Sequence, residues 1–257
     1  MKHPLRTLLL AVCCGLAAAC TQRQERLKLM SYNIRNGIGI DNIQDIGRIA
    51  RVILREAPDL VALQELDSAT LRADGRYIPG ELGRMTGMHA TFGRAIGFAG
   101  GSYGVGLLSR TEPLAVRSIP LPGREEARVL LMAEFPDYTV CITHLSLTPE
   151  DRLASLPIIR EATDTCRKPV LLAGDFNTGN AAAVLAGLGG GFRILSDTTR
   201  MTFPSDNPAV RIDYILGRGL PTSATVAESA VDHTATASDH CPLWVTLAWK
   251  RGKQPGK

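Results

Sequence analysis

Apolar and polar residues alternate in blocks along the chain, and most of these blocks predict β-strands. Each block is a short, mostly apolar run bounded by Gly, Pro, Asn, Asp or Ser, as buried strands are. Such runs occupy residues 27–34, 59–65, 103–110, 128–135, 138–145, 169–176, 210–216 and 241–249, with a weaker run at 224–230.

Three segments have helical spacing instead. Apolar residues from Ile43 to Leu54 recur every three or four positions, with Asn42 as the expected N-cap and Pro58 excluding continuation. Residues 149–165 begin with a proline in the first turn, where helices tolerate it, and residues 181–188 predict a shorter helix. The glycine-rich stretch 75–106 predicts loops around short elements.

The order of these elements predicts a layered α/β fold. Strands outnumber helices, and their continuous apolar runs imply burial on both faces. Two sheets packed face to face, each covered outside by helices, would bury them. No linker-like change of composition and no repeat follows residue 26, so residues 27–249 are expected to form one domain. Residues 250–257 would be a frayed basic tail.

The N-terminus has the organisation of an export signal. Two positive charges precede an apolar run too short to span a bilayer comfortably, and small residues follow up to Cys20. Residues 1–19 thus resemble a lipoprotein signal peptide, with Cys20 as the lipidated residue and residues 20–26 as a polar tether. Ala17 stands where Leu or Val is usual. Simple cleavage is the second interpretation, and a retained membrane helix is the third.

Composition and charge exclude little. An apolar content of 45% and a charged content of 21% are ordinary for a globular protein with a sizeable core. The formal charge of +4 falls to +2 without residues 1–19, so nothing predicts a strong nucleic-acid-binding face. Cys141, Cys166 and Cys241 would remain after export, and the sequence does not pair them. Buried thiols are expected rather than zinc ligands.

Polar side chains stand where the predicted strands end. Asp175 and Asn177 follow an apolar run two positions apart, so both point to the same side of an extended chain. The other polar residues at strand ends are Asn33, Glu65, His144, Asp213, Asp239 and His240. Each alone is explained as a turn former, a surface residue or a packed histidine. Together they predict a shared site, because α/β proteins build sites at strand tips.

The ordered series YN, LQE, THL, GDFN, RIDYI and SDH resembles the endonuclease/exonuclease/phosphatase superfamily, which has the DNase I-like fold. The resemblance spans residues 27–249. It implies a four-layer α/β sandwich of two packed mixed sheets flanked by helices, in agreement with the pattern of strands. It also implies a metal-dependent hydrolase that acts on phosphoester bonds.

The residue types suit a hard divalent cation. Glu65 and Asp239 offer carboxylate oxygens and Asn33 an amide oxygen, and no cysteine–histidine cluster is present. Mg²⁺ is therefore expected, with Mn²⁺ or Ca²⁺ as alternatives. Such an ion keeps positions open for water and a phosphoryl oxygen and acts as a Lewis acid.

His240 is the natural general base, because an unperturbed imidazole has a pKa near neutrality. The resemblance implies Asp213 as the carboxylate partner of His240. It also implies that Asp175 and Asn177 position or activate the attacking water and that His144 donates to a non-bridging phosphate oxygen. Asp175 can equally serve as base, and the sequence leaves that division open.

Two departures bear on the substrate. THLS stands where DNA-repair nucleases of the superfamily carry Tyr-x-x-Asn, which counts against that branch. GGSYGVGLLSR resembles a segment of bacterial members, with Val105 where Asn is frequent. Tyr103 in this segment is a candidate phosphate contact, or else a half-buried strand aromatic. Arg35 is a further candidate for substrate binding.

The leading hypothesis is an exported, membrane-anchored and monomeric lipoprotein at the periplasmic or extracellular face. It would be a phosphodiesterase or phosphatase for a small molecule or a phospholipid headgroup. The runner-up is an extracellular nuclease whose basic face would include Arg35, Arg94, Arg110 and Arg128. An aromatic content of 5% gives that reading few surfaces for base stacking. A non-catalytic binding lipoprotein is third.

Overall fold

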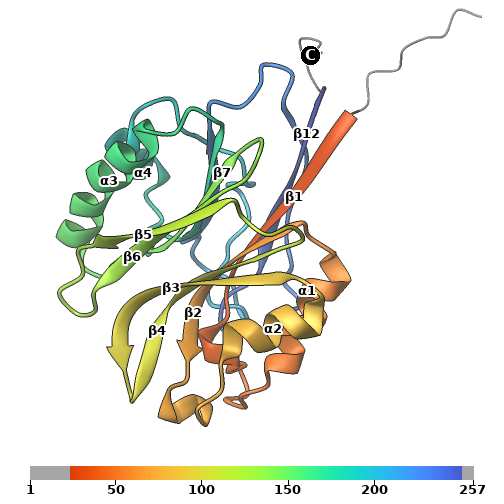
Figure 1. The fold of residues 1–257 in the computed structure, drawn as a ribbon, viewed down its shortest axis with the longest axis vertical. Coiled ribbons are helices and arrows are strands. Elements are labelled where there is room, and N and C mark those ends of the chain that lie inside the picture. Colours follow the sequence, from red (N-terminus) through yellow and green to blue (C-terminus); the bar gives the residue numbers. More distant parts are fainter. Residues whose placement is uncertain (1–23, 251–257) are drawn as a thin grey trace, which may run out of the picture.

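Two six-stranded β-sheets pack face to face, and helices cover the outer face of each sheet (Figure 1). The structure is a computed structural model that describes residues 24–250. The predicted signal peptide, Cys20 and residues 251–257 of the predicted tail lie outside the described residues. No helix within residues 24–250 is long and apolar enough to cross a membrane.

The first sheet combines strands from the two ends of the described chain. Its strands are, in order across the sheet, β11 (Thr225–Val231), β12 (Leu243–Lys250), β1 (Gln24–Asn33), β2 (Leu60–Ser68), β4 (Gly101–Ser109) and β3 (His89–Phe98). β1 and β2 are parallel, and the other neighbours are antiparallel. Helices α1 (Ile46–Glu56) and α2 (Ile78–Thr86) pack on its outer face. The short 3-10 helices η1 (Arg35–Gly37) and η2 (Leu71–Ala73) follow β1 and β2.

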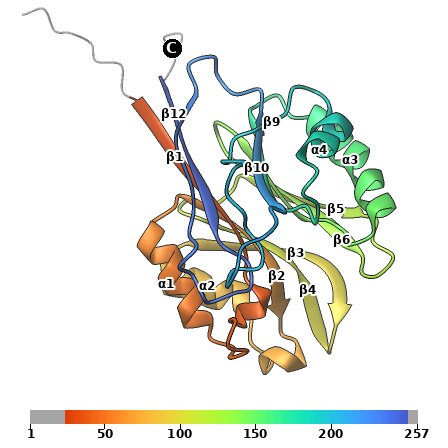
Figure 2. The same cartoon turned by 180° about the vertical axis from the view of Figure 1, so that it is seen from behind.

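The second sheet is built from the middle of the chain (Figure 2). Its strands are, in order, β5 (Ala115–Leu121), β6 (Arg128–Glu134), β7 (Thr139–His144), β8 (Val170–Asp175), β10 (Asp213–Arg218) and β9 (Arg193–Ile194). β7 and β8 are parallel. Helices α3 (Pro149–Asp164) and α4 (Ala181–Leu188) cover its outer face.

Three apolar cores hold the four layers together. Leu29 of β1 and Ile142 of β7 face the core between the sheets, whereas their neighbours Met30 and Cys141 face the helices. This alternation follows from the period of two along a strand, and it explains why these strands read as continuously apolar. The predicted four-layer α/β sandwich is confirmed. The three cysteines of the described residues, Cys141, Cys166 and Cys241, are free thiols.

All nine predicted strands occur, with ends that differ by up to three residues. The largest difference concerns the predicted tether, because β1 already begins at Gln24. Gln24 pairs with Lys250 and Arg26 with Ala248 in the β1–β12 ladder. Backbone hydrogen bonds extend both strands beyond their apolar residues, so the tether is shorter than residues 20–26. Lys250 likewise belongs to a strand and not to the tail.

The start of α1 was wrongly predicted. Its N-cap is Asp45, whose Oδ1 accepts a hydrogen bond from the Arg48 backbone N at 3.2 Å. Asn42 lies in the preceding turn with a φ of 59°, and Ile43 is 60% exposed instead of facing the core. Asn42 and Ile43 thus resemble the N-cap and the first apolar residue of a helix, although the helix itself begins about one turn later, at Ile46.

The glycine-rich stretch 75–106 was also wrongly predicted as mostly loop, since it contains α2, β3 and the start of β4. A Cβ on Gly104 would lie 2.1 Å from the Gly93 carbonyl oxygen across the β3–β4 pair. One on Gly93 would lie 3.0 Å from Cβ of Leu131 in the facing sheet. These glycines permit close approach within and between the sheets. The edge strands β5 and β9 were missed because they bury too few side chains to give an apolar run.

Candidate functional site

The polar residues at the strand tips meet at one end of the sandwich. In the second sheet, Asp175 is the register partner of both His144 on β7 and Asp213 on β10. From the first sheet, the Asn33 Nδ2 donates a hydrogen bond to Asp175 Oδ2 at 3.2 Å. Strand pairing within the second sheet and packing between the two sheets therefore bring residues as far as 142 positions apart into contact.

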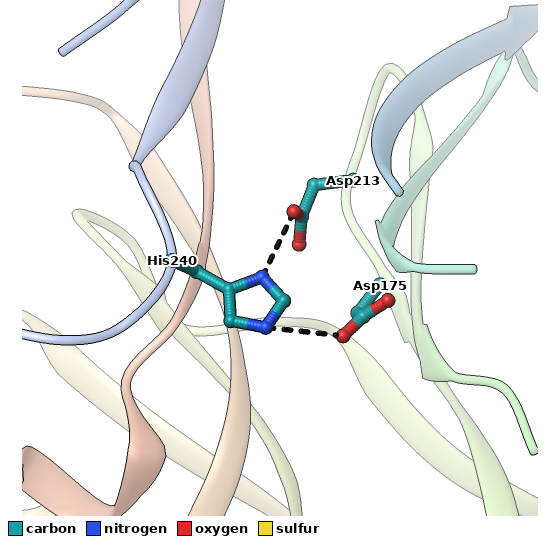
Figure 3. A group of neighbouring side chains, drawn as sticks. All are labelled: Asp175, Asp213 and His240. Atoms are coloured by element: carbon teal, nitrogen blue, oxygen red, sulfur yellow. Dashed lines mark hydrogen bonds and ion pairs between the residues drawn. The ribbon is translucent and has the colours of Figure 1, made fainter. Parts of the chain in front are cut away.

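His240 lies between two aspartates at the centre of this cluster (Figure 3). Its Nδ1 is 3.0 Å from Asp213 Oδ2, and its Nε2 is 3.7 Å from Asp175 Oδ2. The three residues are buried, and their potential ligand atoms lie within 4.8 Å of one another. The Phe203 ring covers the imidazole at a centroid distance of 4.8 Å.

The charges of this cluster shift two pKa values upward. Burial and the neighbouring Asp213 raise the pKa of Asp175 to about 7. Burial alone would lower the pKa of His240, but Asp213, Asp175 and Asp239 outweigh it and raise that pKa to about 10. The choice of His240 as base started from the unperturbed pKa of an imidazole, and the neighbouring aspartates raise the pKa of His240 above that value. In this arrangement, His240 is an imidazolium at neutral pH, and Asp175 has the near-neutral pKa.

His144 faces Asp175 from the other side. Its Nε2 is 3.5 Å from Asp175 Oδ2. Burial, then the positive charges of Arg128 and His240, hold its pKa well below the usual value of 6.5. His144 is thus a neutral imidazole at neutral pH.

The GDFN tip, Gly174–Asn177, does not point both side chains at one spot. Asp175 Oδ1 accepts a hydrogen bond from the Asn177 backbone N at 2.8 Å, and Asn177 has a left-handed φ of 50°. The Asn177 Nδ2 donates to the Leu145 carbonyl at 2.8 Å. The turn after β8 breaks the extended geometry that the spacing assumed. Asn177 ties together the two segments that follow His144 at the end of β7 and Asp175 at the end of β8.

Two of the expected metal ligands, Asn33 and Glu65, lie on strands of the first sheet, and the third, Asp239, lies in the loop before β12. Asn33 Nδ2 donates to Glu65 Oε1 at 3.0 Å, and the Ser238 hydroxyl links the Asn33 carbonyl (2.7 Å) to Asp239 Oδ1 (3.3 Å). Glu65 has a φ of 58° at a bulge in the β2–β4 ladder, which turns it out of the strand's alternation.

Arg35, a predicted substrate-binding residue, pairs with one of these ligands. Its Nε is 3.6 Å from Asp239 Oδ2, and its backbone N donates to Asn33 Oδ1 at 3.1 Å. A cation bound through Asp239 would therefore compete with the Arg35 guanidinium.

The donor chemistry of the cluster fits a hard divalent cation. Glu65 is half-buried and carries a second carboxylate oxygen for which the structure gives no hydrogen bond. Within the described residues, Asp213 Oδ1 is buried without a hydrogen-bond partner. The carboxylate and amide groups of the cluster offer oxygen as the ligand atom, which Mg²⁺, Mn²⁺ and Ca²⁺ prefer.

Tyr103 lies on β4, and Glu65 is among the charges that act on its phenol. It pairs with Asp67 across the β2–β4 ladder and is 8% exposed. Burial and the charges of Glu65 and Glu126 raise the pKa of its phenol. The half-buried strand aromatic was one of the two readings of this residue.

Sequence reasoning missed the β5–β6 loop. Glu125 accepts hydrogen bonds from the Ser146 hydroxyl and from the Leu147 backbone N, both at 2.7 Å, directly after His144. Burial opposes its charge, but these bonds and that from Arg128 lower its pKa to about 2. Arg128 is 6% exposed and also bonds Glu126 at 3.0 Å. In the sequence the segment REEAR resembles an ordinary solvated charge run.

The four-layer sandwich with a buried Asp–Asp–His group at one end has the architecture of DNase I-like hydrolases. The model of the endonuclease/exonuclease/phosphatase family matches residues 30–240, so the chain belongs to this family. Members of the family are hydrolases that act on phosphoester bonds.

Solved structures with this fold are similar over most of the chain. The family protein of Bacteroides thetaiotaomicron has a TM-score of 0.72 at 19% identity, covering 89% of this chain and 100% of its own. The family protein of Beutenbergia cavernae has a TM-score of 0.69 at 22% identity, with 88% and 72% covered. A mannosyl-6-phosphatase of Bacteroides thetaiotaomicron has a TM-score of 0.68 at 19% identity, with 86% and 99% covered.

Proposed function

We propose that the protein is an exported, divalent-metal-dependent phosphoesterase that hydrolyses a phosphomonoester or phosphodiester of a small molecule. The observation that carries the proposal is the buried Asp175–His240–Asp213 group beside the half-buried Glu65. Such a site holds a base, a cation and metal-binding oxygens together. The fold shared with a mannosyl-6-phosphatase adds support.

Glu65, Asn33 and Asp239 would hold the metal, with Mg²⁺ as the first choice and Mn²⁺ or Ca²⁺ as alternatives. When bound, the ion supplies Lewis-acid stabilisation of the negative charge that develops on the phosphoryl oxygens. Asn33 would have to present its oxygen, which accepts from the Arg35 backbone N in this structure.

The chain's own residues divide the proton chemistry. Asp175, with a pKa of about 7, takes a proton from the attacking water. The His240 imidazolium, held by Asp213 Oδ2, stabilises the negative charge of the phosphoryl group. His144 remains neutral and offers a hydrogen bond to a non-bridging oxygen. Asn177 keeps the His144 and Asp175 loops in register through the Leu145 carbonyl.

A lipid anchor at Cys20 favours a soluble substrate over a headgroup of the anchoring membrane. β1 begins at Gln24, four positions after Cys20, and only its far end, Asn33, lies in the site. Four residue steps span at most about 14 Å, whereas the ten residues of β1 place the site about 30 Å further along the strand. The site would then lie at the end of β1 opposite to the anchored end.

Three of the four arginines named for the nuclease alternative are paired with carboxylates. Arg35 pairs with Asp239, Arg110 with Asp59 at 3.4 Å, and Arg128 with the two glutamates of the β5–β6 loop. Paired arginines offer a weaker attraction to a nucleic-acid backbone than free ones.

The proposal is tested with the protein lacking residues 1–20. It is assayed with Mg²⁺, Mn²⁺ or EDTA on p-nitrophenyl phosphate, bis-p-nitrophenyl phosphate, sphingomyelin, an inositol phospholipid and plasmid DNA. We expect metal-dependent hydrolysis of a small ester that EDTA abolishes, and Glu65→Gln should raise the metal concentration needed for half-maximal rate. Degradation of DNA alone would favour the nuclease. No hydrolysis of any phosphoester would support a binding protein.

A further inference from the structure

One wall of the site carries an arginine whose position is fixed from two directions. Arg72 follows β2, and its Nε and Nη2 bond the two carboxylate oxygens of the buried Asp67 at 2.6 and 2.8 Å. Its guanidinium carbon stacks over the Phe98 ring at 4.6 Å and over the Tyr103 ring at 5.4 Å. The side chain nevertheless remains 42% exposed, so an ordered guanidinium edge faces solvent.

A carboxylate stands on the same wall. Glu126 accepts from Arg128 Nη1 at 3.0 Å, and its side chain is 27% exposed. Burial raises the pKa of Glu126. The positive charges of Arg128 and Arg72 lower this pKa, and the negative charge of Glu65 raises it. The hydrogen bond to Asp67 is the main cause that raises the pKa of Arg72, and the negative charge of Glu65 raises it further. Asp67, which holds Arg72, lies two residues after Glu65 on β2, and Glu126 is within electrostatic range of both Glu65 and Arg72.

We propose that this wall binds the part of the substrate beyond the scissile phosphate, and that this part is an uncharged group with several hydroxyls, such as a sugar or polyol. The inference rests on the proposed phosphoesterase function and names its substrate class. Arg72 donates to hydroxyl oxygens, Glu126 accepts from hydroxyl protons, and the Phe98 ring, 38% exposed, contacts the C–H face.

The charge of the wall decides against a second anionic group. The guanidinium groups of Arg72 and Arg128 are already paired with carboxylates, Arg72 with Asp67 and Arg128 with Glu125 and Glu126. A second phosphate, as in a nucleotide chain, would find neither of them unpaired and would face the carboxylates that hold them.

A cationic headgroup fits no better. A quaternary ammonium group binds through the faces of aromatic rings. Here the Arg72 guanidinium already stacks on the rings of Phe98 and Tyr103 and would repel a second cation. An uncharged hydroxylated group meets neither obstacle.

The test compares esters that differ in hydroxyls. Values of kcat/KM are measured for glucose 6-phosphate against p-nitrophenyl phosphate, and for glycerophosphoinositol against bis-p-nitrophenyl phosphate. Because leaving groups differ, the quantity compared is the ratio of hydroxylated to plain ester in each variant relative to wild type. Glu126→Ala removes a charged acceptor and should lower this ratio about tenfold. Arg72→Lys, which keeps the charge but loses the planar fork, should lower it too.

The matched control is Glu161→Ala, on the exposed face of α3, which should leave the ratio unchanged. Thermal melting identifies any variant that is unfolded. An unchanged ratio in folded Glu126→Ala and Arg72→Lys overturns the inference, as does a wild-type preference for phosphocholine or a dinucleotide over both hydroxylated esters.

Failure of the proposed function is distinguishable. If wild type hydrolyses no ester, the phosphoesterase proposal fails, and calorimetric titration of glucose 6-phosphate in EDTA decides the subsite by itself. Binding about tenfold weaker in Glu126→Ala than in Glu161→Ala supports the subsite. Equal binding, or none to wild type, overturns it.

Discussion

The two histidines of the site contact the same aspartate and differ in charge. His240, from the loop before β12, has Asp213 and Asp175 within 3.7 Å, and its pKa rises to about 10. His144, at the end of β7, has its pKa lowered by burial, by Arg128 and by His240 itself. Both are at least nine-tenths buried by exposed area.

Burial alone would therefore give two neutral imidazoles, and the neighbouring charges separate them. On the His240 side, the second sheet supplies two carboxylates through the β8–β10 pair. On the His144 side, Arg128 at the start of β6 supplies a guanidinium. One histidine is prepared to carry positive charge and the other to remain neutral, which suits different tasks in one site.

Removing the aspartate that the two histidines share should have the largest effect. Asp175→Asn abolishes the proposed base and one carboxylate that holds the imidazolium, so kcat should fall by about 10³-fold or more. Steady-state rates on the best small ester measure this. Asp137→Asn, in the turn between β6 and β7 at the far end of the sheet, is the control. A fall of less than tenfold in a folded variant would mean that Asp175 is not the base.

Changing only the His240 side should have the next largest effect. Asp213→Asn removes the 3.0 Å partner of His240, so the pKa of His240 should fall from about 10 and the rate by about 10²-fold. NMR titration in EDTA measures the pKa.

The raised pKa of His240 also links Asp213 to stability. Because that pKa lies above the unfolded value of 6.5, the stabilisation is fully present below pH 6.5 and is lost as the pH rises through about 10. Thermal melts of wild type and Asp213→Asn should therefore differ most below pH 6.5 and converge above about pH 10. A difference that grows with pH would contradict the assignment.

The sequence predicted the layers and the convergence of strand tips well, because both follow from apolar periodicity. Leu171–Asn177 reads as a buried strand with a polar tip, and β8 is that strand. The pKa of His240 could not be read the same way, since it depends on Asp213 and Asp175, which only the sheet pairing places beside it.

Features that depend on turns or on polar contacts could not be predicted from the sequence pattern. The left-handed φ of Asn177 directs its side-chain amide to the Leu145 carbonyl. In an extended chain the amide would point to the same side as the Asp175 carboxylate. Glu125 leaves no periodic signal, because its partners Ser146 and Leu147 lie on another loop, 21 and 22 residues away. Apolar patterns report burial, and they do not report which polar groups meet across loops.

A smaller effect is expected from the loop behind His144. Glu125→Ala frees Ser146, Leu147 and Thr148, so the segment that begins after His144 loses its anchor. We expect kcat to fall about tenfold with little change in KM, because a misplaced group costs more in the transition state. Faster hydrogen exchange at Leu147 should accompany it. Glu125→Gln should restore part of the rate, since it keeps an acceptor oxygen, and an unchanged exchange rate would exclude this positioning role.

The smallest effect concerns the charge on the His144 side. Arg128→Met removes the guanidinium that opposes protonation of His144, so the pKa of His144 should rise yet stay below 6.5, because burial is the larger cause. Arg128→Lys keeps the charge and is the matched control. NMR titration in EDTA, with His144→Gln to assign the signal, measures both. If Arg128→Met leaves the pKa unchanged, burial and His240 alone keep His144 neutral, and the difference between the two histidines depends on the aspartates only.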